Sequence, residues 1–166
     1  LQVAVIAHAL GLIKNKYYGG RVAVESIALH AIYHDATEVL TGDLPTPVKY
    51  FSPAIRDAYQ AIEGHAVDQL LSLLPQDLRA DYRSLLTVED AEIRGLIKAA
   101  DTIAAYIKCL EEETAGNHEF SRAKKAIEAK VHSLCERPEV ARFVKDFVPS
   151  FSLTLDELGK PLETAP

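Results

Sequence analysis

The sequence predicts an all-α protein, a bundle in which helices pack on one another without a sheet. Apolar residues recur at the spacing of a helical turn, most clearly between residues 89 and 114. No segment shows the apolar–polar alternation of a half-buried strand. Glycines and prolines fall where helices would end or begin. At 166 residues the chain is long enough for one domain with a substantial core.

The N-terminal half is predicted to contain three helices, over residues 1–16, 22–40 and 53–74. Gly19 and Gly20 provide the turn that ends the first helix. The segment TGDLPTP forms a loop after the second, and its Pro47 suits the start of a new helical turn. Ser52 is expected to cap the third helix, because its hydroxyl can accept a hydrogen bond from an unpaired backbone N–H group.

The C-terminal half is predicted to contain four helices, over residues 75–86, 89–114, 119–134 and 138–147. Pro75 and Pro138 start the first and the last of them. The longest should bury one stripe, formed by the apolar residues at positions 93, 96, 97, 100, 103, 104, 107 and 110. We expect a single domain over residues 1–158 and a flexible tail over residues 159–166.

The composition argues against several classes of function. A net charge of −6 disfavours non-specific binding to a nucleic acid polymer, which needs clustered lysines and arginines. No apolar run approaches the roughly 18 residues that cross a membrane, and there is no signal-peptide pattern. Cys109 and Cys135 have neither metal-finger spacing nor the density of a disulfide scaffold. A cytoplasmic location without a membrane partner is therefore expected.

The beginning of the sequence reads as the middle of a helix. The opening segment LQVAVIAHALGLI is amphipathic, no capping residue precedes Leu1, and the chain contains no methionine. We therefore expect the first helix to begin upstream of Leu1, so that residues of a functional site can also lie there.

Three titratable residues interrupt the apolar face of the second predicted helix. At about 100° per residue, His34, Asp35 and Glu38 fall within an arc of roughly 100°. Val24 and Ile27 lie on the same arc, which predicts that all three point into the bundle. Imidazole and carboxylate side by side suit a divalent metal ion, and buried carboxylates are costly without such a partner. The alternative is a hydrogen-bonded core histidine beside an aspartate that caps a nearby segment.

A further carboxylate comes from the longest predicted helix. Asp101, in the segment IKAADTIAAY, lies at the edge of the apolar stripe beside Ile97. Ala99 and Ala100 would allow a neighbouring helix to approach closely, so that Asp101 could reach residues on it. The alternative is an ordinary exposed aspartate on a helix.

Together, the His34–Asp35 pair and the isolated Asp101 resemble the HD-domain metal-dependent phosphohydrolases. The segments YHDATEVLTGDLPTPVKY, KAADTIAAYIKCLEE, AGNHEF and FVPSFSLTLDEL are similar to the bacterial 5′-deoxynucleotidases of that fold. The resemblance covers nearly the whole chain. It implies an HD-domain helical bundle that hydrolyses 2′-deoxyribonucleoside 5′-monophosphates to deoxynucleoside and phosphate. It also implies a divalent metal cofactor such as cobalt or manganese, and a homodimer.

The resemblance also implies roles for individual residues. His34, Asp35 and Asp101 would be metal ligands, and both aspartates would also lie against the substrate phosphate. Glu38 would be the catalytic acid or base, and Asp35 would share in catalysis. The substrate would contact the loop formed by Asp43, Leu44, Pro45 and Thr46.

The family requires a further histidine ligand, which is expected upstream of Leu1. His8 and His30 are the internal alternatives, and His30 lies one helical turn before His34. The other histidines lack an acidic partner at metal spacing and are expected on the surface; they are His65, His118 and His132.

Two other functions remain open at this point. One is an HD phosphohydrolase that acts on a triphosphate, cyclic or alarmone nucleotide. The short TGDLPTP loop and the absence of further basic clusters in the sequence disfavour a triphosphate. The other is a non-catalytic α-helical interaction module, in which the HD residues form a buried polar network without stoichiometric metal.

Overall fold

The computed structural model describes residues 1–49, 51–153 and 155–158, and all regular secondary structure in these ranges is helical. These ranges contain ten α-helices and two 3-10 helices and no strand, so the predicted all-α class is confirmed. The predicted flexible tail, residues 159–166, lies outside the described residues. None of the described helices is long and apolar enough to cross a membrane.

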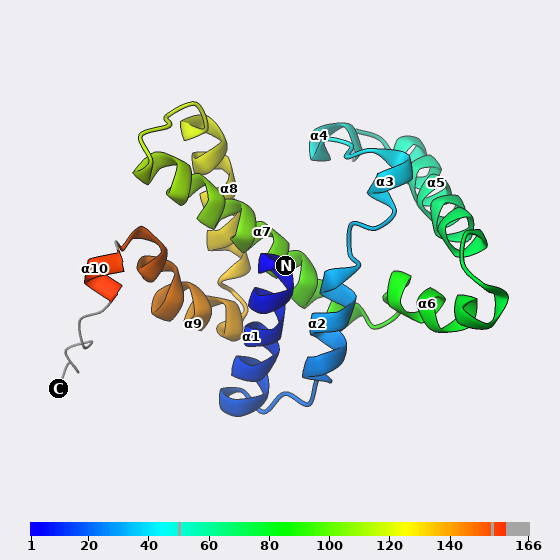
Figure 1. Ribbon diagram of the computed structural model, residues 1–166. Coiled ribbons are helices and arrows are strands. Elements are labelled where there is room, and N and C mark those ends of the chain that lie inside the picture. Colours follow the sequence, from blue (N-terminus) through cyan, green and yellow to red (C-terminus); the bar gives the residue numbers. More distant parts are fainter. Residues whose placement is uncertain (50, 154, 159–166) are drawn as a thin grey trace.

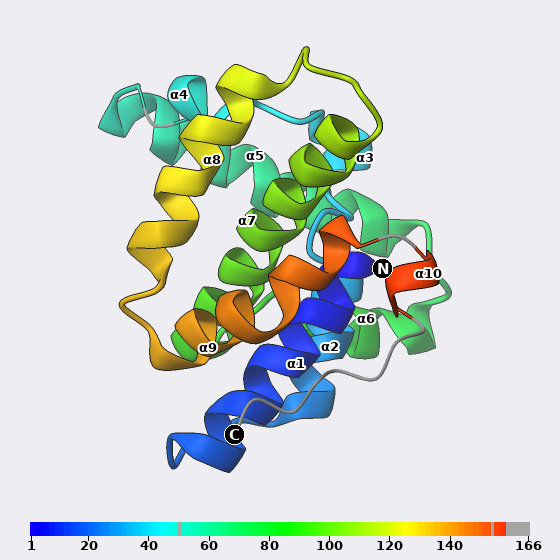
Figure 2. The same cartoon turned by 90° about the vertical axis from the view of Figure 1, so that its left-hand side faces the viewer.

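The helices form two groups, which we call the body and the arm (Figure 1). The body consists of α1 (Gln2–Tyr17), α2 (Val24–Ile32), α7 (Ala91–Thr114), α8 (Ser121–Leu134), α9 (Pro138–Phe147) and the 3-10 helix η2 (Val148–Ser152). Figure 2 shows α9 crossing in front of α1 and α7, with α8 beside α7. The short helix α10 (Leu155–Leu158) follows η2.

The arm contains the four helices between α2 and α7. They are α3 (Glu38–Thr41), α4 (Thr46–Lys49), α5 (Pro53–Ser72) and α6 (Arg79–Leu86), with the 3-10 helix η1 (Gln76–Leu78) before α6. In Figure 1 the arm stands to one side of the body, and α6 returns the chain to contact α2. The α5 helix begins as predicted, with the backbone N–H of Ile55 donating to the Ser52 hydroxyl at 3.2 Å.

The body encloses the main hydrophobic core, and α7 contributes the largest part of it. Leu96, Ile103 and Ile107 on the predicted apolar stripe are fully buried. Asp90 caps this helix by accepting hydrogen bonds from the first free backbone N–H groups. Close packing of α1 on α2 depends on Gly11, where a Cβ would come within 2.9 Å of the Ile27 side chain.

A buried ion network ties three helices of the body together. The Glu139 side chain is 1% exposed, and its Oε1 accepts from Arg137 Nε at 3.0 Å and from Lys14 Nζ at 3.5 Å. Lys14 also pairs with Glu92 at 2.9 Å, so the network joins α1, α7 and α9. Gly95 leaves room for it, since a Cβ there would lie 2.7 Å from the Arg137 guanidinium.

The arm has only a small apolar centre of its own. Its buried residues are Tyr59, Ala66, Val67 and Leu71, all on α5. Among the described residues, none from α3 to α6 belongs to the main core cluster. Several large apolar side chains of the arm remain exposed, including Val39 and Phe51. The arm is therefore held to the body by much less buried apolar surface than holds the body together.

The predicted continuous helix over residues 22–40 is wrong. The α2 helix ends at Ile32, tight turns follow, and α3 begins at Glu38. In a continuous helix the Ala31 carbonyl would accept the Asp35 backbone N–H, but here the His34 imidazole Nδ1 lies 2.7 Å from that carbonyl. The Glu38 backbone N–H instead bonds the Asp35 carbonyl at 2.9 Å. A side chain thus competes with the helical hydrogen bond and stops the helix.

Candidate active site

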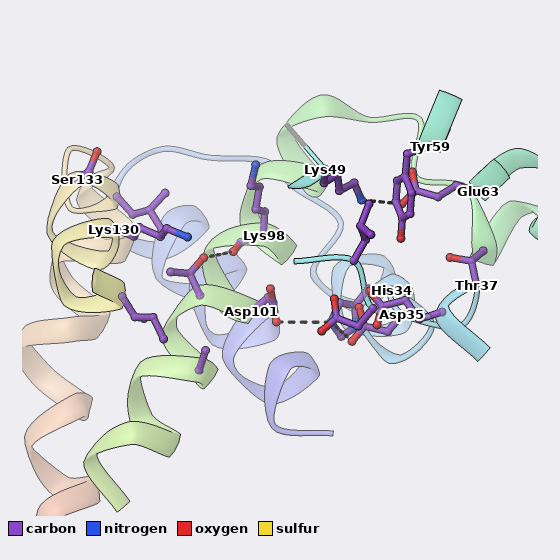
Figure 3. A pocket seen from close by; sticks show the side chains of 17 residues that line it. His34, Asp35, Thr37, Lys49, Tyr59, Glu63, Lys98, Asp101, Lys130 and Ser133 are labelled. Carbon is purple, nitrogen blue, oxygen red and sulfur yellow. Dashed lines mark hydrogen bonds and ion pairs between the residues drawn. The ribbon is translucent and has the colours of Figure 1, made fainter. Parts of the chain in front are cut away.

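A pocket of about 780 Å³ lies between the arm and the body (Figure 3). The turn after α2, the α3–α4 loop and α5 form one side of it, and α7 and α8 form the other. Five carboxylates line it, from Asp35, Glu38, Asp43, Glu63 and Asp101. His34 also lines it, so the pocket gathers most of the chemically active residues that the sequence suggested.

The His34 ring is oriented by the end of α2. Its Nδ1 pairs with the Ala31 carbonyl, which assigns the ring proton to Nδ1 and leaves a lone pair on Nε2 in the neutral form. Nε2 is buried and makes no hydrogen bond of good geometry. It lies 2.9 Å from Asp35 Oδ2 and 3.9 Å from Asp101 Oδ1, the latter an ion-pair distance rather than a hydrogen bond. Figure 3 shows Asp101 facing His34 across the pocket floor.

This arrangement fits a bound cation. A neutral imidazole nitrogen and two carboxylates that face one another repel unless a proton or a metal ion lies between them. A proton on the imidazole would relieve this repulsion. The interaction with Asp101, and then the negative charge of Asp35, raise the pKa of the His34 imidazole, whereas burial lowers it. A divalent ion would meet the same need, and the nitrogen and oxygen donors suit first-row metals. In the described part of the chain, no three such side chains are close enough to form a complete metal site.

Two carboxyl groups of the pocket, those of Asp35 and Glu38, have a pKa raised toward the protonated form. Burial is the main cause that raises the pKa of Asp35, with the charges of Asp101 and Asp43 adding to it and His34 opposing it. Burial also raises the pKa of Glu38, and the charge of Asp35 is the next contribution. A carboxylate with a raised pKa is a better proton acceptor, which suits Glu38 to acid–base chemistry.

The expectation that His34, Asp35 and Glu38 point into the dry interior of the bundle is wrong. The side chains of Asp35 and Asp101 are 56% and 58% exposed, and those of His34 and Glu38 are half-buried. They face an open pocket, because the helix that would have carried the first three inward stops at Ile32. Water or a small ligand can therefore reach the carboxylates of Asp35 and Asp101, whereas the Nε2 atom of His34 is covered.

The loop between α3 and α4 forms the next part of the pocket. Gly42 has φ +70°, in the region that favours glycine, and so turns the chain out of α3. Asp43 and Leu44 line the pocket, whereas Pro45 is exposed and is not among its lining residues. Thr46 begins α4, but its side chain lies outside the described part of the structure.

The remaining histidines lie away from the pocket. The Nδ1 atom of His30 lies 3.1 Å from the Leu85 carbonyl of α6, so this ring links α2 to the arm. His8 is half-buried on α1 and does not line the pocket. The histidines expected on the surface, His65, His118 and His132, are exposed, which confirms that expectation.

Sequence reasoning missed the lysines and the tyrosine of the pocket. Lys49, Lys98 and Lys130 come from α4, α7 and α8 and line one space, although they form no cluster in the sequence. Lys49 pairs with Glu63 at 2.7 Å and lies 4.2 Å from the centre of the Tyr59 ring. These residues share no local spacing, apart from Lys98 at one helical turn before Asp101.

Comparisons with known proteins agree with this site. A family model described as "5′-deoxynucleotidase YfbR-like" matches residues 1–151. The 5′-deoxynucleotidase of Vibrio cholerae is 52% identical over 163 residues, which cover 96% of this chain and 82% of that protein. The 5′-deoxynucleotidase of Yersinia pestis is 50% identical over 161 residues, covering 96% and 81%.

Comparison with a solved structure identifies the fold. The crystal structure of an HD-domain phosphohydrolase from Listeria innocua superposes with a TM-score of 0.72 over 90% of this chain and 73% of that one, at 24% sequence identity. The predicted HD-domain bundle is therefore confirmed. With a family model over most of the chain and relatives at half identity, this protein belongs to the family of YfbR-like 5′-deoxynucleotidases.

Proposed function

We propose that this 5′-deoxynucleotidase hydrolyses 2′-deoxyribonucleoside 5′-monophosphates to deoxynucleoside and phosphate in the pocket between arm and body. The observation that carries the proposal is the convergence of Asp35 and Asp101 on the lone-pair side of His34 Nε2. The pocket volume of about 780 Å³ also suits a mononucleotide, since small-ligand pockets commonly measure roughly 300–1,000 Å³.

His34, Asp35 and Asp101 would hold a divalent ion, together with the further histidine expected upstream of Leu1. When bound, such an ion withdraws charge from phosphate oxygens and makes water a better nucleophile. HD phosphohydrolases are typically metal-dependent, and cobalt or manganese is the choice that we propose here. The Ala31 carbonyl keeps the His34 ring in one tautomer and orientation, as a fixed hydrogen bond does for metal-binding histidines generally.

Glu38 would act as the acid–base residue. It lies at the first turn of α3, next to the His34–Asp35 turn, and its pKa is raised mainly by burial. Its carboxylate would orient the attacking water and accept its proton, and Asp35 and Asp101 would lie against the phosphate. The raised pKa makes the Glu38 carboxylate a better proton acceptor, which supports this role.

The α3–α4 loop would receive the nucleoside. Asp43 can accept a hydrogen bond from a sugar hydroxyl, and Leu44 offers an apolar contact in the pocket. By the family resemblance, Pro45 and Thr46 would also contact the substrate. A homodimer is proposed on the same ground, and light scattering of the purified protein would test it. A cytoplasmic location is proposed because the two cysteines lack the density of a disulfide scaffold.

The direct test is phosphate release by purified full-length protein, with dAMP and AMP as substrates, before and after removal of metal with a chelator. We expect release from dAMP that exceeds release from AMP, is lost on chelation and returns with cobalt or manganese. Absence of release from dAMP under all these metals would refute the proposed function. A parallel reaction with dATP separates it from a triphosphatase, which would prefer dATP.

The role of Glu38 is tested by Glu38→Gln, which keeps the shape of the side chain but removes its basicity. We expect turnover of dAMP to fall by about 10²–10⁴-fold, the range of general acid–base catalysis. Metal content, measured by elemental analysis, should be unchanged, because Glu38 is not a proposed ligand. Asp101→Asn is the matched comparison, in which metal content and turnover should fall together. A fully active Glu38→Gln variant would contradict the assignment.

A further inference from the structure

Two lysines line the pocket from the body side, which also carries Asp101. Lys98 is on α7, three residues before Asp101 and therefore on the same face of the helix. Lys130 comes from α8, which packs along α7. In Figure 3 the ammonium of Lys130 points from α8 toward α7, where Lys98 and Asp101 lie. Both lysines line the same cavity as Thr102, which follows Asp101.

The charge of the pocket calls for such cations. Five carboxylates line it, and a phosphate monoester carries about two negative charges near neutral pH. One divalent ion would not offset them all. Lys49 lies on the arm side of the pocket, on α4, where it pairs with Glu63 at 2.7 Å and lies over the face of the Tyr59 ring. The lysines that line the body side, which also carries Asp101, are Lys98 and Lys130.

We propose that Lys98 and Lys130 form a phosphate-binding pair that holds the substrate's phosphate group and the inorganic phosphate released from it. This inference rests on the proposed function. Lys98 is fixed in register with Asp101 by the turn of α7, so it would grip non-bridging oxygens on the side away from the arm. Lys130 would close the pocket from α8. Ammonium groups bind phosphate as compact charges with several donors, and such charge-assisted hydrogen bonds are stronger than neutral ones.

The pair predicts a defined kinetic change. Lys98→Gln and Lys130→Gln should each raise KM for dAMP by about tenfold, as expected for the loss of one charge-assisted hydrogen bond. The inhibition constant of inorganic phosphate, competitive with dAMP, should rise by a similar factor. The double variant should also lose most of the dependence of KM on salt, because ionic strength screens the exposed charges that were removed. Lys130→Arg should restore binding, since it keeps the charge.

Matched controls separate this role from a general effect of charge. Lys108→Gln removes a lysine from α7 that pairs with Glu112 at 3.1 Å, and Lys125→Gln removes one from α8; neither residue lines the pocket. Both should keep wild-type KM and phosphate inhibition. Thermal unfolding of every variant identifies any loss of folding, and Lys130, which is exposed on α8, can be changed without disturbing the core.

Two results would refute the proposed role of Lys98 and Lys130. One is a folded double variant whose KM for dAMP and inhibition constant for phosphate are both within twofold of the wild-type values. The other is phosphate inhibition that is non-competitive with dAMP, which would place the anion outside the substrate pocket. Both differ from a failure of the proposed function, in which the wild-type protein itself releases no phosphate from dAMP.

Discussion

The body and the arm are both helical, but they are stabilised very differently. The body buries a continuous apolar cluster and an ion network across α1, α7 and α9. The arm buries a few residues of α5 and leaves large apolar side chains such as Phe51 exposed. Segments with little buried apolar surface open at lower free energy than the core. The pocket therefore joins a firmly held side, with Asp101, to a weakly held side, with Glu38 and Asp43.

The sharpest way to test this contrast is to remove the same side chain from each region. Leu96 is 0% exposed in the body and Leu71 is 2% exposed in the arm. We expect Leu96→Ala to lower the global free energy of unfolding by about 3–5 kcal/mol, the range for a buried leucine. Leu71→Ala should lower it less, because the arm can open while the body stays folded. Denaturant unfolding gives both values.

Hydrogen exchange completes the comparison. In Leu71→Ala the amides of α5 should exchange faster while those of α7 keep their protection, and KM for dAMP should rise. If the two variants lose equal stability and their α5 and α7 amides are affected together, the arm and the body unfold as one unit and the contrast does not hold.

A smaller effect is expected from the ion network of the body. Glu139→Gln would leave Lys14 and Arg137 without their shared anionic acceptor and should destabilise the protein by about 2 kcal/mol. Lys14 and Arg137 remain 19% and 29% exposed, so water compensates for part of the loss. KM for dAMP should stay unchanged, because the network lies away from the pocket. A rise in KM with unchanged thermal stability would contradict this separation.

The smallest effect on global stability is expected from the glycine that turns the α3–α4 loop. Gly42→Ala places a Cβ at φ +70° and ψ 164°, a backbone region adopted almost only by glycine, which costs about 1–3 kcal/mol locally. The strain falls in the arm, so KM for dAMP should rise while the thermal transition of the body hardly moves. Gly64→Ala is the control: this glycine lies inside α5 with no atom near the position of a Cβ, and alanine there should be neutral or slightly stabilising. An unchanged KM in Gly42→Ala would remove the loop from substrate binding.

The sequence predicted the body better than the arm, for a physical reason. The α7 stripe could be located residue by residue, because a long helix with a dry face must repeat every 3.6 residues. The end of α2 at Ile32 could not be located from the sequence, since no glycine or proline marks it. A hydrogen bond from the His34 side chain to Ala31 replaces the helical one, and helical periodicity does not reveal that choice.

The candidate site divides in the same way. His34, Asp35 and Asp101 could be grouped from their residue types and their resemblance to a family, and the structure brings them to one pocket. The lysines could not, because Lys49 and Lys130 come from distant helices and only the packing of α4 and α8 brings them to the same space. Their positions are a property of the tertiary fold.

The interruption between α2 and α3 has a consequence for how this enzyme can be altered. In an unbroken helix, one residue added between Asp35 and Glu38 would rotate the glutamate by about 100° and remove it from the site. Here hydrogen-bonded turns join two separate elements, and the imidazole is anchored to Ala31 on its own side of the gap. A residue inserted between Asp35 and Glu38 would break the bond from the Glu38 N–H to the Asp35 carbonyl and move the glutamate, whereas the contact of His34 with Ala31 lies before the insertion. Such an insertion would therefore change the reach of Glu38 separately from the orientation of the imidazole.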